Sequence, residues 1–217
     1  MHLPLFPLNT VLFPGGGLPL QIFEVRYLDM VARCHRSGEP FGVVGLRRGS
    51  EVRQASSPQS GAGAAHDEFF PVGTLARIEQ LQRPQAGLMI IRCLGTRRFQ
   101  VQRSEQQRYG LWVGDVELLG DDVAVPVPPD LEHARVGLQD LAHNIEHSIS
   151  RSGETDVELP LRKPYRWDDC GWLANRWCEM LPLDREVKHR LMALDSPVLR
   201  LELVADLLAQ LGLASSR

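Results

Sequence analysis

The sequence predicts an α+β fold, with an irregular β-barrel over residues 1–120 and an α-helical bundle over residues 131–217. Three observations support this prediction. The chain opens with apolar runs broken by prolines, which excludes a helix because each proline removes a donor and clashes with the preceding turn. Short apolar runs bounded by turn residues, which are typical of strands, then follow up to about residue 119. Beyond a proline-rich linker at residues 121–130, the apolar spacing changes to the period of helices.

The opening segment, residues 3–27, contains two apolar runs separated by Pro14-Gly15-Gly16-Gly17. Prolines are tolerated in edge strands and at bulges, and glycines allow backbone conformations that are closed to other residues. This pattern predicts an irregular β-segment, a tight crossing and a second strand. Helix-forming residues from Glu24 to Arg36, followed by Gly38 as a stop signal, predict a helix directly afterwards.

The remaining strands of the barrel are predicted from short apolar runs between turn residues. They cover residues 41–46, 72–81, 88–95, 96–101 and 112–119. Gln85-Ala86-Gly87 is a predicted turn between two of them. Residues 47–67 are mostly small, polar and unpatterned, so we expect a flexible surface loop there.

The carboxy-terminal part is predicted to contain helices because its apolar residues recur on one helical face. The helices are expected at about residues 131–149, 167–180, 185–194 and 197–211. Asp184 and Ser196 precede two of these helices and are typical N-cap residues. Gly212 follows the last helix as a stop signal.

Four ordered motifs carry a family resemblance. They are Leu5-Phe6-Pro7-Leu8, Val11-Leu12-Phe13-Pro14-Gly15, Leu18-Pro19-Leu20 and Ile22-Phe23-Glu24-Val25-Arg26-Tyr27. This opening resembles the amino-terminal, substrate-binding domain family of Lon proteases, and the step Gly95-Thr96-Arg97-Arg98-Phe99 is similar to it too. Val25 departs from the family, which commonly has proline before the Arg-Tyr pair. The resemblance covers nearly the whole chain and implies a PUA-like barrel followed by helices.

The resemblance implies a non-catalytic module that binds unfolded or exposed hydrophobic polypeptide segments, without ATP and without cleaving them. A phosphate-binding loop needs Gly-Lys-Ser/Thr, whereas Arg162 precedes Lys163 and Val187 precedes Lys188. We therefore expect a stand-alone module without ATPase or Ser-Lys protease domains, acting as an adaptor in protein quality control. A protease or a chaperone is the expected partner, and no cofactor is expected.

Aromatic residues are the candidates for polypeptide contact. In the opening segment they are Phe6, Phe13, Phe23 and Tyr27. A client segment could add as a strand beside the irregular edge strand, although each of these residues is equally compatible with the core. Trp167, Trp172 and Trp177 are spaced by five and cannot share one helix face. Core packing is favoured for this group, and Trp172 is kept as a candidate contact.

An arginine-rich stretch offers an alternative function in RNA binding. Between residues 77 and 108 there are seven arginines against two glutamates, with Arg92, Arg97 and Arg98 as the candidate phosphate contacts. Phe99 is the only aromatic residue in this region before Tyr109, so base stacking has little support. The net charge of −3 gives no expectation of nucleic-acid binding. We favour solvent-facing strand surfaces, or charge complementarity between the barrel and an acidic helix, and expect nucleic acid not to be a partner.

A second alternative is an uncharacterised hydrolase. His143 and His147 match the H-x-x-E-H pattern of inverted zinc peptidases. Both histidines, however, lie opposite the apolar stripe of their predicted helix, where a zinc ion would have neither a third ligand nor a sheltered cavity. We therefore expect exposed histidines, no metal and no catalytic residues, with Cys34 buried and inert.

Composition suggests the cellular location. No apolar run is long enough to span a bilayer, and no signal-peptide pattern opens the chain. The four cysteines are scattered and form no Cys-x-x-Cys pair, which is typical of free thiols in a reducing compartment. We expect a cytoplasmic protein without a membrane partner.

Overall fold

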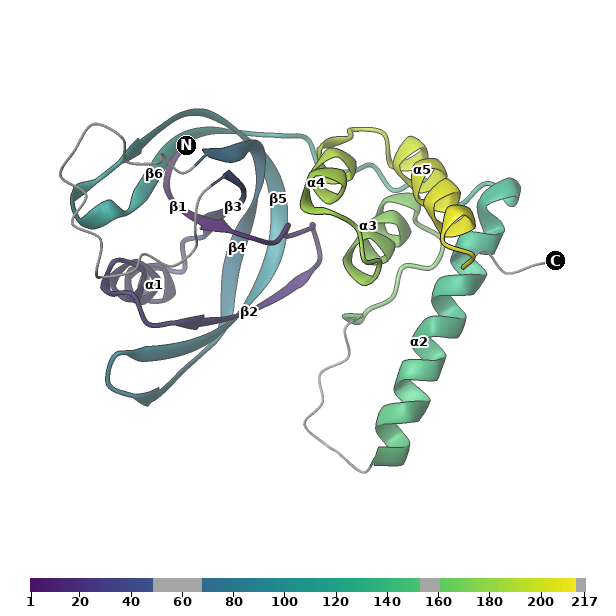
Figure 1. Cartoon of the computed structure of the whole chain (residues 1–217), viewed down its shortest axis with the longest axis horizontal. Helices are drawn as coiled ribbons and strands as arrows, with labels where there is room; N and C mark the ends of the chain where they lie inside the picture. Colours follow the sequence, from purple (N-terminus) through teal and green to yellow (C-terminus); the bar gives the residue numbers. More distant parts are fainter. Residues whose placement is uncertain (49–67, 153–160, 214–217) are drawn as a thin grey trace. The chain divides into compact units, whose positions relative to one another are not determined.

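The computed structural model describes residues 1–48, 68–152 and 161–213. The chain divides into two compact units (Figure 1), which we call the barrel unit and the helical unit. The barrel unit contains Met1–Gly120 and Asp184–His189, and the helical unit contains Asp121–Leu183 and Arg190–Arg217. The predicted α+β fold, with strands first and helices afterwards, is confirmed.

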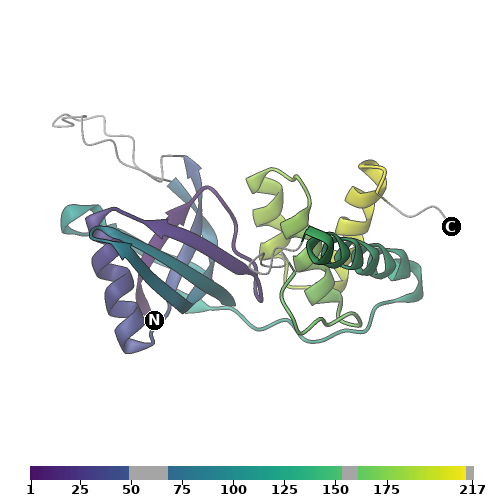
Figure 2. The same ribbon diagram turned by 90° about the horizontal axis from the view of Figure 1, so that it is seen from below.

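The barrel unit is built on one six-stranded sheet that closes on itself (Figures 1 and 2). Its strands are β1 (His2–Leu8), β2 (Gly17–Ile22), β3 (Phe41–Arg48), β4 (Glu68–Gln85), β5 (Leu88–Gln106) and β6 (Trp112–Leu118). The strand order is β2-β5-β4-β3-β1-β6, and an additional pairing of β5 with β6 closes the barrel. The β1–β3 pair is parallel, whereas the other pairs are antiparallel.

The β4–β5 hairpin differs from the strands expected from the sequence. Residues 88–95 and 96–101 were predicted as separate strands, but they belong to the single strand β5, 19 residues long. Register shifts along β4 and β5, such as the one between Thr74 and Ala76, let the paired strands bend without breaking. Arg47 and Arg48 extend β3 rather than joining a loop, and the rest of the predicted loop lies outside the described residues.

Helix α1 (Val25–Ser37) supplies much of the barrel core. Its buried residues Tyr27, Met30, Val31 and Cys34 pack with β-strand residues such as Phe41 and Ile91 in one hydrophobic cluster. The predicted stop is confirmed, because Gly38 adopts the left-handed conformation with φ 74° and its N–H donates to the carbonyl oxygen of Cys34. The position of α1 is therefore determined by burial of its apolar face.

The helical unit contains α2 (Glu132–Ser152), α3 (Cys170–Met180) and α5 (Pro197–Gln210), while α4 (Arg185–Ala193) belongs partly to each unit. Ser196 caps α5 as predicted, accepting a hydrogen bond from the N–H of Leu199. The prediction that a helix begins at Trp167 is wrong. The helix begins at Cys170 because the Asp169 carboxylate accepts hydrogen bonds from the N–H groups of Gly171 and Trp172.

The segment expected to be a linker is bonded to the helices of its own unit. The N–H of Cys170 donates to the carbonyl oxygen of Val125 at 2.9 Å. The guanidinium of Arg200, which is fully buried, holds the Asp122 carboxylate at 2.5 and 3.1 Å and the Asn175 side-chain oxygen at 3.0 Å. A buried arginine is tolerated only when its donors are paired in this way.

The first five residues of α4, Arg185–His189, complete the barrel unit. The ring of His189 stacks on Phe70 with 4.2 Å between ring centroids and 14° between planes. Its Nε2 lies 3.2 Å from the carbonyl oxygen of Val72, and Arg185 donates to the carbonyl oxygen of Leu46 at 2.8 Å. A segment distant in sequence thus covers one side of the barrel strands.

Candidate functional site

The proline- and glycine-rich opening anchors β2 to the barrel. The hydroxyl of Thr74, which is buried, donates to the carbonyl oxygen of Leu12 at 2.6 Å. The N–H of Gly15 donates to the carbonyl oxygen of Gly95, and the N–H of Gly95 donates to the carbonyl oxygen of Gly16, both at 2.8 Å. These bonds place the crossing directly on β5, so that β2 continues as the neighbour of β5 from Gly17 onwards.

The charged pair at the start of α1 has a structural role. A guanidinium nitrogen of Arg26 lies 2.8 Å from a carboxylate oxygen of Glu24, and another donates to the carbonyl oxygen of Gly110 at 2.7 Å. The same guanidinium lies 4.5 Å from the ring centroid of Tyr27. The Glu24 side chain makes no capping hydrogen bond, so it acts here through its ion pair with Arg26.

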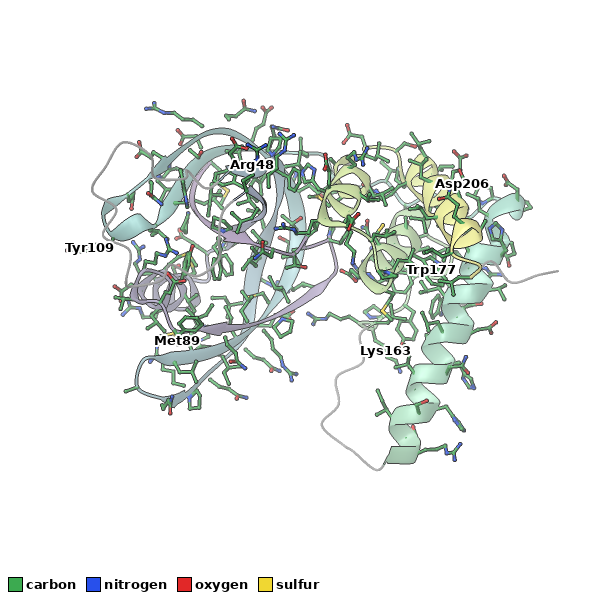
Figure 3. All side chains as sticks on the ribbon, viewed as in Figure 1. Arg48, Met89, Tyr109, Lys163, Trp177 and Asp206 are labelled. Carbon is green, nitrogen blue, oxygen red and sulfur yellow. The ribbon has the colours of Figure 1, made fainter. Side chains whose placement is uncertain are left out.

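An apolar hollow of ≈ 330 Å³ lies between α1 and the tip of the β4–β5 hairpin. It is lined by Leu28 from α1 and by Arg83, Gln85, Ala86, Gly87, Leu88 and Met89 from the hairpin. Leu28 and Met89 also pack against the hydrophobic core of the barrel, so the floor of the hollow is continuous with that core. Figure 3 labels Met89 at this corner of the barrel unit.

Two exposed apolar residues extend the surface beyond the hollow. Phe23, in the short connection between β2 and α1, is 54% exposed, and Val25, the first residue of α1, is 73% exposed. Ile22 pairs with Met89 across β2 and β5, which places Phe23 at the level of Leu88 on the hairpin. Exposed apolar side chains that adjoin a hollow are typical of sites for protein or ligand binding.

Strand β2 borders this surface and has an open edge. Among the pairings of the described residues, β2 pairs only with β5. Its residues alternate, with Leu18 and Ile22 buried and Pro19 and Gln21 exposed. A strand paired on one side presents backbone donors and acceptors on the other, although Pro19 has no N–H to donate. The surface therefore combines an apolar hollow with a sheet edge, and we call it the β2–α1 surface.

The aromatic residues that were candidates for polypeptide contact are mostly buried in the structure. Phe6, Phe13 and Tyr27 are buried in the barrel core, and the Phe6 and Tyr27 rings lie 4.0 Å apart. Phe23 alone among these residues is exposed at the β2–α1 surface. Trp172 is only 9% exposed and packs edge-to-face on Trp167 with ring centroids 5.2 Å apart. Core packing was the alternative for all five aromatic candidates, and four of them are buried, with Phe23 as the exception.

The arginines of the alternative RNA site do not form one surface. Arg92 and Arg97 are exposed on β5, but Arg98 is buried and donates to the carbonyl oxygen of Gly120 at 3.5 Å. Successive residues of a strand face opposite sides of the sheet. Arg97 and Arg98 therefore cannot contact the same phosphate backbone, and the expectation of Arg98 as a surface contact is wrong.

The residues considered for catalysis are two exposed histidines and a buried cysteine. His143 and His147 are both exposed, as predicted, with ring centroids 6.4 Å apart. Among residues 1–48, 68–152 and 161–213, no three His, Cys, Asp or Glu side chains are grouped as metal ligands. Cys34 is buried as expected, and burial raises the pKa of its thiol, which disfavours the nucleophilic thiolate.

Leu28, Leu88 and Met89 were not recognised as site residues from the sequence. The turn at Gln85-Ala86-Gly87 was predicted, and Gly87 does adopt a positive φ of 78° there. Two large apolar residues directly after a hairpin turn, where polar residues are the rule, were the available signal. The sequence alone does not show that α1 packs beside that turn.

Solved structures of similar fold define the class of this protein. A Lon N-terminal domain protein from Xanthomonas campestris is 31% identical, with a TM-score of 0.70, and the alignment covers 96% of this chain and 98% of that one. The N-terminal domain of Mycobacterium avium complex Lon protease has a TM-score of 0.60 at 13% identity and is similar in fold alone. The chain therefore has the fold of Lon amino-terminal domains.

The chain belongs to the family described as the ATP-dependent protease La (LON) substrate-binding domain, whose model matches residues 2–210. The Lon protease of Anaeromyxobacter dehalogenans is 26% identical over 209 residues, which are 95% of this chain and 23% of that protease. The Lon protease of Cytophaga hutchinsonii is 25% identical over 159 residues, or 73% of this chain and 17% of the protease. The match is thus confined to a minor part of these proteases. None of the helices in the described parts is long and apolar enough to cross a membrane.

Proposed function

We propose that this chain is a non-catalytic module that binds exposed apolar segments of unfolded polypeptides at the β2–α1 surface. Binding requires neither ATP nor cleavage. In this proposal the chain acts in the cytoplasm as an adaptor that presents clients to a protease or chaperone, and nucleic acid is not a partner. Its membership of the Lon substrate-binding family supports a role in substrate recognition.

The observation that carries the proposal is the hollow between α1 and the β4–β5 hairpin, bordered by exposed Phe23 and Val25. An apolar client side chain that enters the hollow would contact Leu28 and Met89. Burying one leucine or phenylalanine side chain contributes about 1.5–3 kcal/mol. Such energies suit weak, repeated binding to many sequences, which is what recognition of unfolded chains requires.

The edge of β2 supplies the second part of the interaction. An extended client can pair its backbone with a sheet edge, so that recognition does not depend on one particular sequence. Pro19 interrupts the row of donors on β2, which limits pairing to a short stretch and protects the edge against self-association. Side chains of the client would then alternate, with every second one directed toward the apolar surface.

The proposal is tested by fluorescence anisotropy with a labelled, permanently unfolded model polypeptide. The double substitution Phe23→Ser and Met89→Ser should weaken binding about tenfold, since a loss of about 1.4 kcal/mol corresponds to that factor. The matched control is Leu118→Ser, which changes an exposed apolar residue on β6 of the same unit. Equal affinities for the double variant and the wild type would contradict the proposed site.

A salt series with a short RNA as second probe separates the alternative function. Apolar contacts depend little on salt, whereas phosphate contacts weaken steeply as salt rises. We expect polypeptide binding that persists at high salt. Binding of RNA alone, lost at high salt and reduced by Arg92→Gln, would replace the present proposal with nucleic-acid recognition.

A further inference from the structure

Arg83 supplies the one charged side chain among the residues that line the hollow. It lies on β4, two residues before Gln85, and it lines the hollow together with Leu28 and Met89. Its side chain is exposed, and in the described parts of the chain it makes no hydrogen bond, ion pair or ring contact. An arginine can lay its aliphatic stem along an apolar wall and keep its guanidinium in water. This guanidinium is therefore available to a ligand.

The strands at the β2–α1 surface supply no acid to balance Arg83. Residues 80–91, at the end of the β4–β5 hairpin, contain no other charged residue, and β2 contains no charged residue at all. The next charged residues along the hairpin, Glu79 and Arg92, are not part of the lining of the hollow. These strands thus present a single positive charge beside the hollow.

Helix α1, the other wall of the hollow, carries a histidine rather than an acid on the side of Leu28. At about 100° per residue, His35 lies within about 20° of Leu28 around the helix, whereas Asp29 lies about 100° away. Glu24, before the helix, is already paired with Arg26 at 2.8 Å. The chain as a whole has a net charge of −3, so the positive charge at the hollow is local. It complements a ligand that carries a negative charge close to an apolar group.

We propose that the β2–α1 surface selects client segments in which an acidic residue accompanies the apolar residue that enters the hollow. The client carboxylate pairs with the guanidinium of Arg83. This inference rests on the proposed function and specifies its substrate class. In an extended client, residues two apart point to the same side, so the acid is expected two positions from the apolar residue. Because the ion pair is exposed to water, it sets a preference among clients, whereas the apolar contact supplies the affinity.

The test compares the affinities of three labelled peptides of equal length, measured by fluorescence anisotropy. Each peptide carries one leucine in a Ser/Gly background, and both positions two residues from the leucine are Asp, Asn or Lys. We expect the wild type to bind the Asp peptide about threefold more tightly than the Asn peptide, and the Lys peptide more weakly than either. The preference should shrink at high salt, which screens exposed charge pairs, while leucine-dependent binding persists.

Reversal of the charge at Arg83 tests whether this side chain sets the preference. Arg83→Glu should invert the order, so that the Lys peptide binds more tightly than the Asp peptide, and Arg83→Gln should remove most of the difference. The matched control is Arg48→Glu, which makes the same change of charge at an exposed arginine of β3. Figure 3 shows Arg48 on the opposite side of the barrel unit from Met89, so this variant should keep the preference for the Asp peptide.

A wild type without a preference for the Asp peptide, or an Arg83→Glu variant that keeps it, would overturn the inference. So would an equal change in Arg83→Glu and Arg48→Glu, because the preference would then follow the net charge of the protein and not the hollow. The proposed function fails by a separate outcome, namely if Met89→Ser leaves the affinity for the Asn peptide unchanged.

Discussion

Gly95 is a residue against which the opening segment packs closely. A Cβ atom at this position would lie 2.3 Å from the carbonyl oxygen of Phe13 and 2.9 Å from a side-chain carbon of Leu12. The nearest obstacle is backbone, which cannot rotate away. Gly95→Ala should therefore break the two hydrogen bonds that hold the Gly15-Gly16 crossing.

We expect Gly95→Ala to lower the free energy of unfolding by about 2–3 kcal/mol, the range of a forced overpacking with a backbone shift. Chemical denaturation measures this change. Gly120→Ala is the control, because nothing lies within 4 Å of its added Cβ, and it should stay within about 0.5 kcal/mol of the wild type. Similar midpoints for the two variants would show that the crossing does not depend on close approach.

Individual residues could be predicted from the sequence only where their chemistry restricts them. Gly38 was predicted to end a helix because glycine adopts the left-handed conformation without a clash from a Cβ atom, and it does so here. Phe13 and Phe23, in contrast, have the same chemistry and similar apolar neighbours, yet one is buried and the other is 54% exposed. Their difference depends on where the chain turns from β2 into α1, and that is a tertiary property.

At the scale of elements, α4 carries a histidine whose protonation opposes folding. Burial lowers the pKa of His189 below its ordinary value of 6.5. The unfolded state therefore binds a proton at a pH where the folded state does not, so stability rises with pH. The stability is fully present above pH 6.5 and is lost progressively as the pH falls below this value.

We expect the free energy of unfolding of the wild type to decrease between about pH 7 and pH 5. His189→Gln, which cannot titrate, should show a smaller decrease over that range. The comparison is His147→Gln, which removes a histidine that is exposed rather than buried. Parallel profiles for the wild type and His189→Gln would contradict a role for this histidine.

The elements themselves were mostly predicted, and the errors have physical causes. Helix α5 was predicted with both ends because Ser196, Pro197 and Gly212 mark them chemically. Strand β5 was divided in two at Gly95 because glycine usually ends a strand in sequence. In the structure Gly95 is required inside the strand by the approach of Phe13, a contact between residues far apart in the chain.

At the scale of the whole molecule, the barrel unit is discontinuous in sequence. Asp184–His189 belongs with Met1–Gly120, and no local pattern in the sequence indicated this return. We expect a fragment of residues 1–120 to lack the cover over Phe70 and Val72 that His189 provides. It should unfold at a lower denaturant concentration than the intact chain and bind a hydrophobic dye, as measured by fluorescence.

The comparison for this prediction is Phe70→Thr in the same fragment, which removes the exposed ring and should reduce dye binding. A fragment as stable as the intact chain would mean that the stacking of His189 on Phe70 contributes nothing to the barrel. The architecture of barrel and helices was predicted from periodicity and turn residues. The composition of each unit was not, because it depends on contacts between distant segments.

The return of Asp184–His189 also bears on synthesis at the ribosome. This segment emerges after every other residue of the barrel unit. At about 5–20 residues per second, the roughly 60 residues between Gly120 and Asp184 take about 3–12 s to translate. For that interval the nascent barrel exposes Phe70, so aggregation of the growing chain is most probable then, and a ribosome-associated chaperone would protect it best.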